Sequence, residues 1–280
     1  MKLIPIITEY WKVDGGACFG VVPKSLWAKN WPPDENNMIT IVNRNLLIDA
    51  GDRKYLLDTG FGSKPDEKYL ANFQISNKRS ITDALIAEGY HPDQVTDVLF
   101  SHLHVDHCGG ALNKDENGKC FPVFRNAVHW TSLSQFENAI HPNARERASY
   151  FAENFAALND AGTLQKIEQD QSISPEVELR ITNGHSIGHL IALIKFNEKT
   201  LVCTGDFIPS SLHIPLPWVP AYDIQPLVSM DEKEKYLDEF AKKNYSLYFT
   251  HDVLTECCTL QHTDKGVRMQ AATTLKQFQE

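Results

Sequence analysis

The sequence SHLHVDHCGG occupies residues 101–110 and directly follows VTDVLF, residues 95–100, a pattern typical of a buried strand. It places four side chains that bind metals close together: His102, His104, Asp106 and His107. In an extended chain the side chains at i and i+2 point the same way, so His102 and His104 are expected to hold one ion together. The chain turns at Gly109-Gly110, so Asp106 and His107 can address a second point nearby. Three imidazoles and a carboxylate suit a divalent ion such as Zn²⁺.

Four side chains do not fill two coordination shells, so further ligands are expected at the ends of other strands. Strand-like runs at 176–182, 200–204 and 246–249 are followed by three candidates: His185, Asp206 and His251. Each candidate therefore occupies the same position as the first group, just beyond the carboxyl end of a strand. Functional residues held on loops by a rigid sheet take this form.

The rest of the chain reads as short strands separated by turns and a few helices. Strands are predicted at 38–47, 54–57, 95–100, 176–182, 190–196, 200–204 and 246–249. Helices are predicted at 80–88, with Ser80 or Thr82 as N-cap, and at 143–158 and 231–243. The strands fall into two groups with helices between them, which favours an α/β sandwich over a doubly wound parallel sheet.

This constellation resembles the metallo-β-lactamase superfamily, in which an HxHxDH motif is followed by a separate His, an Asp and a final His. The resemblance spans about residues 38–251 and includes Leu57-Asp58-Thr59-Gly60, which is similar to an early LLDTG turn of that family. It implies an αββα sandwich, formed here by a single domain over 1–280 with a helical insertion around 130–165.

The resemblance also implies roles for the ligands and two bound divalent ions, favouring Zn²⁺, with Mn²⁺ or Fe²⁺ as alternatives. On that pattern His102, His104 and His185 bind the first ion. Asp106, His107 and His251 bind the second. Asp206 bridges both ions and takes the proton from the attacking water, so Asp106 and Asp206 are the expected catalytic residues, and Asp58 orients ligand imidazoles.

The expected activity is that of a zinc-dependent hydrolase that uses a bridging hydroxide to cleave a lactone or carboxylic ester. Antibiotic-hydrolysing branches have Cys or Ser in place of Asp206, and the domains that mark the glyoxalase, RNA-processing and flavodiiron branches do not fit this chain. The lactonase and organophosphate-hydrolase branch remains, although Pro209 stands where lactonases often have Tyr. Phosphotriester or phosphodiester hydrolysis, a mononuclear iron persulfide dioxygenase and a silent metal-binding module stay open as alternatives.

Aromatic and proline-rich segments at 15–33 and 208–227 are expected to line an apolar substrate pocket. The candidate pocket residues are Phe19, His213, Trp218 and Tyr222. A further histidine, His189, is expected to pack or hydrogen-bond near the site. Together these residues indicate a hydrophobic small-molecule ester or lactone as substrate.

The composition of the chain argues against several other classes of function. The chain has 280 residues and a formal net charge of −9, which argues against nucleic-acid and anionic-membrane binding. No apolar run approaches the roughly 18 residues of a membrane span. The six cysteines show no CxxC pair, which favours reduced thiols and a cytoplasmic protein. Whether Cys257 and Cys258 are redox-active or ordinary thiols, and whether the chain forms a homodimer, stays open.

Overall fold

The computed structural model describes residues 1–280 and divides the chain into two compact units. Unit 1 comprises Met1–Tyr10 and Asn43–Gln169, and unit 2 comprises Trp11–Val42 and Asp170–Glu280. The boundaries fall inside the first two strands, so each of these strands contributes residues to both units.

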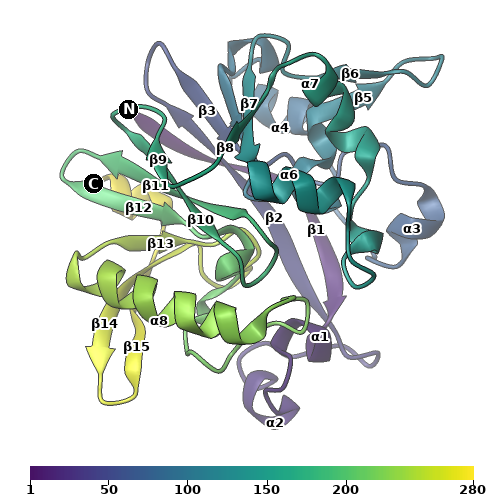
Figure 1. Cartoon of the computed structure of the whole chain (residues 1–280). Helices are drawn as coiled ribbons and strands as arrows, with labels where there is room; N and C mark the ends of the chain where they lie inside the picture. The colour runs from purple at the N-terminus through teal and green to yellow at the C-terminus, as the bar shows by residue number, and fades with distance from the viewer. The chain divides into compact units, whose positions relative to one another are not determined.

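Unit 1 is built on a six-stranded sheet with the order β1-β2-β3-β4-β7-β8 (Figure 1). β2 and β3 are antiparallel, whereas β3, β4, β7 and β8 run parallel to one another. The strands are β1 (Lys2–Asp14), β2 (Met38–Asp49), β3 (Lys54–Leu57), β4 (Asp97–Leu99), β7 (Val128–Ser132) and β8 (Leu164–Ile167), and a separate pair is formed by β5 (Leu112–Lys114) and β6 (Cys120–Pro122). The helices are α3 (Glu67–Ala71), α4 (Ile81–Ala87), α5 (Val105–Cys108), α6 (Leu133–Ile140) and α7 (Ala156–Asp160).

The core of unit 1 lies between this sheet and its helices. Leu56 and Val98 are neighbours on β3 and β4 and are completely buried. They belong to one apolar cluster with Leu85 of α4, Ala139 of α6 and Leu158 of α7. Burial of such side chains contributes about 1.5–3 kcal/mol each, which holds the helices against one face of the sheet.

Unit 2 is built on a seven-stranded sheet with the order β15-β14-β13-β12-β11-β10-β9. All neighbours are antiparallel except β12 and β13, which are parallel and are joined through the long helix α8. The strands are β9 (Gln171–Ser172), β10 (Val177–Thr182), β11 (His189–Phe196), β12 (Lys199–Cys203), β13 (Ser246–Tyr248), β14 (Cys257–Thr263) and β15 (Gly266–Thr273). The helices are α1 (Gly15–Phe19), α2 (Lys24–Trp27), α8 (Pro226–Lys242) and α9 (Leu275–Gln279).

α8 covers one face of the sheet of unit 2. Leu193, Val202, Leu247 and Cys258 are successive cross-strand partners on β11 to β14 and form a buried row. Phe240 of α8 belongs to the same apolar cluster. Cys258 therefore serves as a core side chain, and burial raises the pKa of its thiol to about 12.

Strand direction brings the candidate ligands of each unit to one edge of its sheet. In unit 1 the parallel strands β3 and β4 end just before Asp58 and the 101–110 stretch. In unit 2, β10, β12 and β13 run in the same direction. They end just before His185, Asp206 and His251, respectively. The candidate ligands therefore stand directly after strand ends in the structure, as the sequence predicted for their positions.

Most elements predicted from the sequence are present. The strands predicted at 38–47, 54–57, 95–100, 176–182, 190–196, 200–204 and 246–249 correspond to β2, β3, β4, β10, β11, β12 and β13. The helix predicted at 80–88 is α4, and the Ser80 side chain accepts a hydrogen bond from the Asp83 amide as its N-cap. The helix predicted at 231–243 is α8, but it begins five residues earlier, at Pro226.

The continuous helix predicted over 143–158 is wrong. That segment holds 3₁₀ turns at Arg147–Ser149 and Ala152–Asn154, and only then begins the short helix α7. The Asn143 side-chain oxygen accepts from the amides of Arg145 (2.9 Å) and Glu146 (3.1 Å), so local side-chain bonds compete with helix formation. Tyr150 is extended and buries its ring, which an exposed helical face would not allow.

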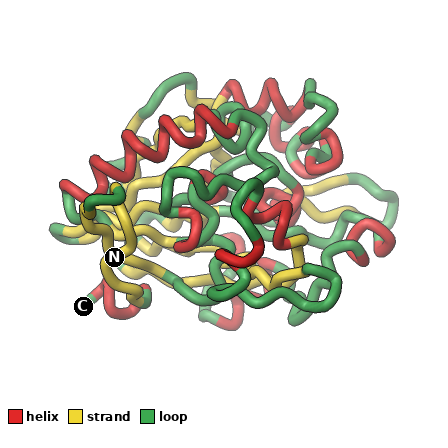
Figure 2. The backbone as a smooth tube through the Cα atoms, turned by 90° about the horizontal axis from the view of Figure 1, so that it is seen from below, coloured by secondary structure: helices red, strands yellow, loops and turns green.

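α8 is the longest helix, and much of the rest of the chain between strands consists of short helical turns and loops (Figure 2). None of the helices is both long enough and apolar enough to cross a membrane.

Two loops of unit 1 meet backbone to backbone beside the candidate metal-binding stretch, residues 101–110. A Cβ atom at Gly62 would lie 2.2 Å from the carbonyl oxygen of Gly109, and one at Gly109 would lie 2.1 Å from that of Phe61. The Lys64 ammonium donates hydrogen bonds to the carbonyl oxygens of Gly109 and Leu112. The chain just after His107 is therefore held close to residues 61–64.

Gly62→Ala should destabilise the protein by about 1–3 kcal/mol more than Gly118→Ala, because only the first Cβ meets backbone atoms. Both glycines have positive φ, +67° and +77°, and a Cβ at Gly118 has no neighbour within 4 Å. The backbone strain is thus common to both variants. Urea unfolding of the two variants measures the difference. Equal losses would contradict a close contact between the two loops.

Candidate functional site

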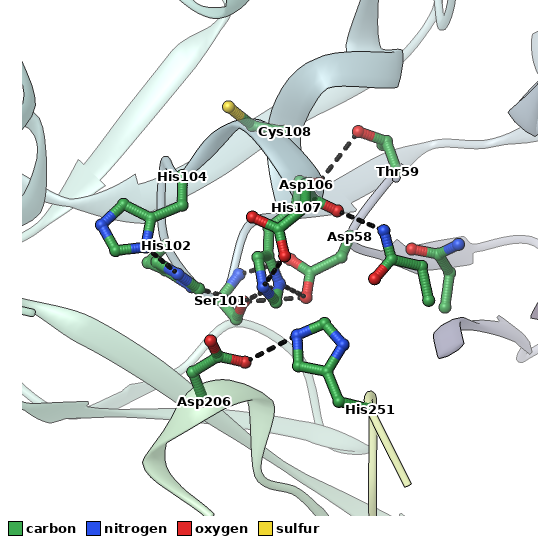
Figure 3. A network of polar contacts seen from close by, with 12 residues as sticks. Asp58, Thr59, Ser101, His102, His104, Asp106, His107, Cys108, Asp206 and His251 are labelled. Carbon is green, nitrogen blue, oxygen red and sulfur yellow. Dashed lines mark hydrogen bonds and ion pairs between the residues drawn. The ribbon is translucent and has the colours of Figure 1, made fainter. Parts of the chain in front are cut away.

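The candidate ligands of unit 1 lie on the segment that connects β4 to α5 and on α5 itself. His102 and His104 are buried, and His102 Nε2 lies 2.8 Å from His104 Nδ1 (Figure 3). His107, on α5, is completely buried, and its Nε2 lies 3.2 Å from Asp106 Oδ2. The structure therefore groups these side chains into two close pairs.

Asp58 joins the end of β3 to this segment. It adopts a left-handed backbone conformation, with φ of +59°, which sharply turns the chain after the strand. Its Oδ1 accepts from the Ser101 amide (2.8 Å), and its Oδ2 accepts from the Ser101 hydroxyl (2.8 Å) and lies 3.0 Å from His107 Nδ1. Asp58 thus contacts a candidate ligand imidazole, as expected. A protonated His107 Nδ1 leaves the lone pair of Nε2 for a metal ion.

Asp206 is the centre of the candidate ligands of unit 2. Its Oδ1 lies 3.0 Å from His251 Nε2 (Figure 3), and its Oδ2 lies 3.4 Å from His185 Nε2. Each of the two carboxylate oxygens therefore faces a different imidazole.

The other nitrogen of each imidazole is bound by the fold of unit 2. His251 Nδ1 lies 2.9 Å from the Val42 carbonyl oxygen, and His185 Nδ1 lies 3.0 Å from Asp223 Oδ1. Because a carbonyl oxygen accepts but does not donate, a proton on His251 Nδ1 satisfies this contact and leaves Nε2 as the nitrogen that can offer a lone pair to a metal ion. The same holds for His185 beside the Asp223 carboxylate.

His189 has a different position from the ligands. Its Nε2 accepts a hydrogen bond from the Asp206 amide (3.1 Å), and its Nδ1 lies 3.1 Å from the Thr182 hydroxyl. It therefore supports the backbone of Asp206, in agreement with the predicted hydrogen-bonding role.

This donor set suits a divalent metal. The predicted ligands comprise five imidazoles and two carboxylates, shared between unit 1 (His102, His104, Asp106, His107) and unit 2 (His185, Asp206, His251). Nitrogen and carboxylate donors of this kind are those of zinc and other first-row divalent ions. The preset lone pairs of His107, His185 and His251 fit the same purpose, because a metal requires unprotonated nitrogen.

The candidate pocket residues all lie in unit 2. Phe19 is completely buried, and its ring stacks on His213 with a centroid distance of 4.9 Å. His213 is buried as well, with Nε2 2.9 Å from the Cys18 carbonyl oxygen and Nδ1 2.7 Å from the Ser210 hydroxyl. Trp218 is half-buried and meets the edge of Phe19, whereas Tyr222 is 40% exposed. Burial lowers the pKa of His213 to about 4, so this side chain is neutral near pH 7.

Sequence reasoning missed several polar side chains that surround the candidate ligands. Ser101 contacts Asp58, Glu146 Oε1 lies 3.4 Å from His104 Nε2, and Asp223 contacts His185. One signal was available for Asp223, because it is the only charged residue between Asp206 and Asp231, in an otherwise apolar segment.

Glu9 is a further buried carboxylate near this part of unit 1. Its Oε1 accepts from Asn43 Nδ2 (2.5 Å) and from the Phe61 amide (3.1 Å). Asn43 Nδ2 also donates to the Asp106 carbonyl oxygen (3.0 Å), so Glu9 helps to hold the backbone of a candidate ligand. Burial raises the pKa of Glu9 to about 7, with a smaller contribution from the charge of Asp106.

Metal-free protein should therefore lose stability between about pH 4.5 and pH 7. The raised pKa of Glu9 means that the folded state binds a proton more tightly than the unfolded chain, and this advantage disappears as the pH rises through 7. The loss amounts to about 3 kcal/mol at most. Glu9→Gln, which cannot ionise, should show a flatter dependence of the unfolding free energy on pH. Parallel curves for the two proteins would contradict the raised pKa.

Comparison with known proteins places this geometry in a family. The model of the metallo-beta-lactamase superfamily matches residues 45–251. A solved structure of a probable metal-dependent hydrolase from Staphylococcus aureus is 30% identical, with a TM-score of 0.88 over 98% of this chain and 96% of that one. AidC, a dizinc quorum-quenching lactonase solved with the product N-hexanoyl-L-homoserine, is 18% identical, with a TM-score of 0.78 over 97% and 94%.

A curated relative leads to the same family. The N-acyl homoserine lactonase AiiA of Bacillus thuringiensis subsp. kurstaki is 25% identical over 187 residues, which is 65% of this chain. The match spans 66% of the length of that lactonase. The expected fold class is thereby confirmed. The relatives are named as lactonases and as a probable metal-dependent hydrolase, and this chain belongs with them to the metallo-β-lactamase superfamily.

Proposed function

We propose that the chain is a dinuclear zinc hydrolase that cleaves an ester-like bond, with a lactone or carboxylic ester as substrate. The observation that carries the proposal is the position of Asp206, whose two carboxylate oxygens face Nε2 of two different histidines. A carboxylate in this position would be able to contact two ions. The relatives named as lactonases, one of them as a dizinc enzyme, support the same reading.

The proposed ligands divide into two sets. His102, His104 and His185 would hold the first ion, Asp106, His107 and His251 would hold the second, and Asp206 would be shared between them. The close pairs His102–His104 and Asp106–His107 in unit 1 agree with this division. When bound, two divalent ions supply an activated water at neutral pH and a Lewis acid for the substrate carbonyl oxygen.

The side chains of this chain have separate tasks in the reaction. Asp206 accepts the proton of the attacking water and delivers it to the leaving oxygen, as a general base and then a general acid. Asp58 keeps His107 in the tautomer that binds metal. Trp218 and Tyr222 offer aromatic surface to an apolar substrate, and the buried Phe19 and His213 support Trp218 from within unit 2.

Zinc as the native metal and a cytoplasmic location are part of this proposal. The six cysteines are free thiols, and five of them are buried. Free thiols persist in reducing compartments, which favours the cytoplasm.

Asp206→Asn should lower turnover by about 10²–10⁴-fold, because the amide neither bridges two ions nor carries the proton. The exposed Asp231→Asn is the matched control and should keep the wild-type rate.

Lactones, aryl esters and phosphotriesters are screened as substrates with Zn²⁺-, Mn²⁺- and Fe²⁺-loaded protein, and bound metal is counted per chain. Two zinc ions and lactone or ester turnover support the proposal. One iron with persulfide oxidation, turnover of phosphotriesters alone, or no bound metal would overturn it.

A further inference from the structure

The helix α8 presents polar side chains from its first two turns to two separate loops of unit 2. These residues are Ser229, Glu232 and Lys233. They come before the apolar stretch of α8 at Tyr236–Ala241. None of them carries chemistry in the proposed reaction, and each has specific partners.

The first loop is residues 183–185, which ends in the candidate ligand His185. The Glu232 carboxylate accepts hydrogen bonds from the amides of Asn183 (2.8 Å) and Gly184 (3.1 Å). A Cβ atom at Gly184 would lie 2.2 Å from the Ser229 hydroxyl oxygen, so glycine is required for this approach. The loop 183–185 therefore packs closely against the start of α8.

Asp223 connects the same part of α8 to the imidazole of His185. It is 3% exposed, its Oδ2 accepts from the Ser229 hydroxyl (2.5 Å), and its Oδ1 lies 3.0 Å from His185 Nδ1. Because both oxygens have a partner, the carboxylate has a fixed orientation. It holds the proton of His185 on Nδ1, and Nε2 keeps the lone pair that a metal ion needs.

The second loop is residues 215–218, within the segment expected to line the pocket. The Lys233 ammonium is 2% exposed and donates to the carbonyl oxygens of Pro215 (2.9 Å), Leu216 (3.3 Å) and Trp218 (3.0 Å). An ammonium has three N–H groups, so these bonds use all of them. Burial lowers the pKa of Lys233 to about 7.

We propose that α8 positions two parts of the site independently. Asp223, fixed by Ser229, is a positioning residue for the metal ligand His185. Lys233 is a positioning residue for the segment 215–218 and so determines substrate selectivity. The inference rests on the proposed function, in which His185 binds metal and Trp218 contacts substrate. Hydrogen-bond partners behind a metal ligand commonly change metal affinity when they are removed, whereas a loop anchor changes substrate binding.

The Asp223 part is tested by competition between the protein and a chromogenic zinc chelator. Asp223→Asn should weaken zinc binding about 10–100-fold, and Ser229→Ala should weaken it less, since Asp223 remains in place. Asp238→Asn is the matched control, because Asp238 also lies on α8 but contacts only Lys242 and His262. Should Asp223→Asn fail to fold, Ser229→Ala carries the test alone. The thermal midpoint of each metal-free protein separates a positioning effect from a loss of folding.

The Lys233 part is tested by the ratio of kcat/KM for a bulky aryl ester to that for a small alkyl lactone. Lys233→Met and Lys233→Gln should change this ratio about tenfold, mainly through KM, and leave zinc affinity unchanged. Gln keeps one donor and therefore offers a variant that folds if Met does not. Lys235→Met, an exposed lysine on the same helix, is the matched control.

The outcomes separate the two ideas. Wild-type protein that binds no metal overturns the proposed function and the role of Asp223 with it. If the wild-type protein binds two ions, but Asp223→Asn and Ser229→Ala leave the zinc affinity unchanged, only the role of Asp223 is overturned. Independent positioning is overturned if the Lys233 variants leave the ratio of the two kcat/KM values unchanged. It is also overturned if they weaken zinc binding as Asp223→Asn does.

Discussion

A neutral imidazole has one nitrogen that carries a proton and donates, and one that has a lone pair and accepts. The chemistry of this chain depends on which nitrogen has each role in its buried histidines. Asp58 binds Nδ1 of His107, Asp223 binds Nδ1 of His185, and a backbone carbonyl binds Nδ1 of His251. Each acceptor leaves Nε2 to face another candidate ligand. In each unit the fold thus provides an acceptor for Nδ1 and leaves Nε2 as the nitrogen that is directed at the other candidate ligands.

These acceptors are held in place by strand direction and by helices packed on the sheets. In unit 2 the strands that precede His185, Asp206 and His251 all point the same way, so their loops emerge at one edge. α8 then covers a face of that sheet with apolar side chains and uses its first turns to hold the loops. Core packing and site geometry therefore share one helix, and changes at its start should be felt in metal and substrate binding.

The sequence alone predicted seven of the fifteen strands and the position of the candidate ligands at strand ends, because both follow local rules. Ligand types stand directly after alternating apolar runs, and a strand end is a short-range signal. The helix over 143–158 was wrong because Asn143 bonds its own neighbours, a competition that helix propensity does not include. β14 and β15 were missed because much of this hairpin is exposed and lacks alternation. Asp223 was missed as a partner of His185 because the two are 38 residues apart and meet only through tertiary structure.

Lys233 reaches its neighbours only through their main-chain oxygens. Any amino acid supplies the same carbonyl group, so the anchor places no demand on which side chains stand at Pro215, Leu216 or Trp218. Those side chains can therefore change in evolution, or be randomised in a library, without loss of this anchor, although Leu216 and Trp218 also pack against other side chains. A single buried lysine thus fixes the path of the loop separately from the chemistry of its side chains.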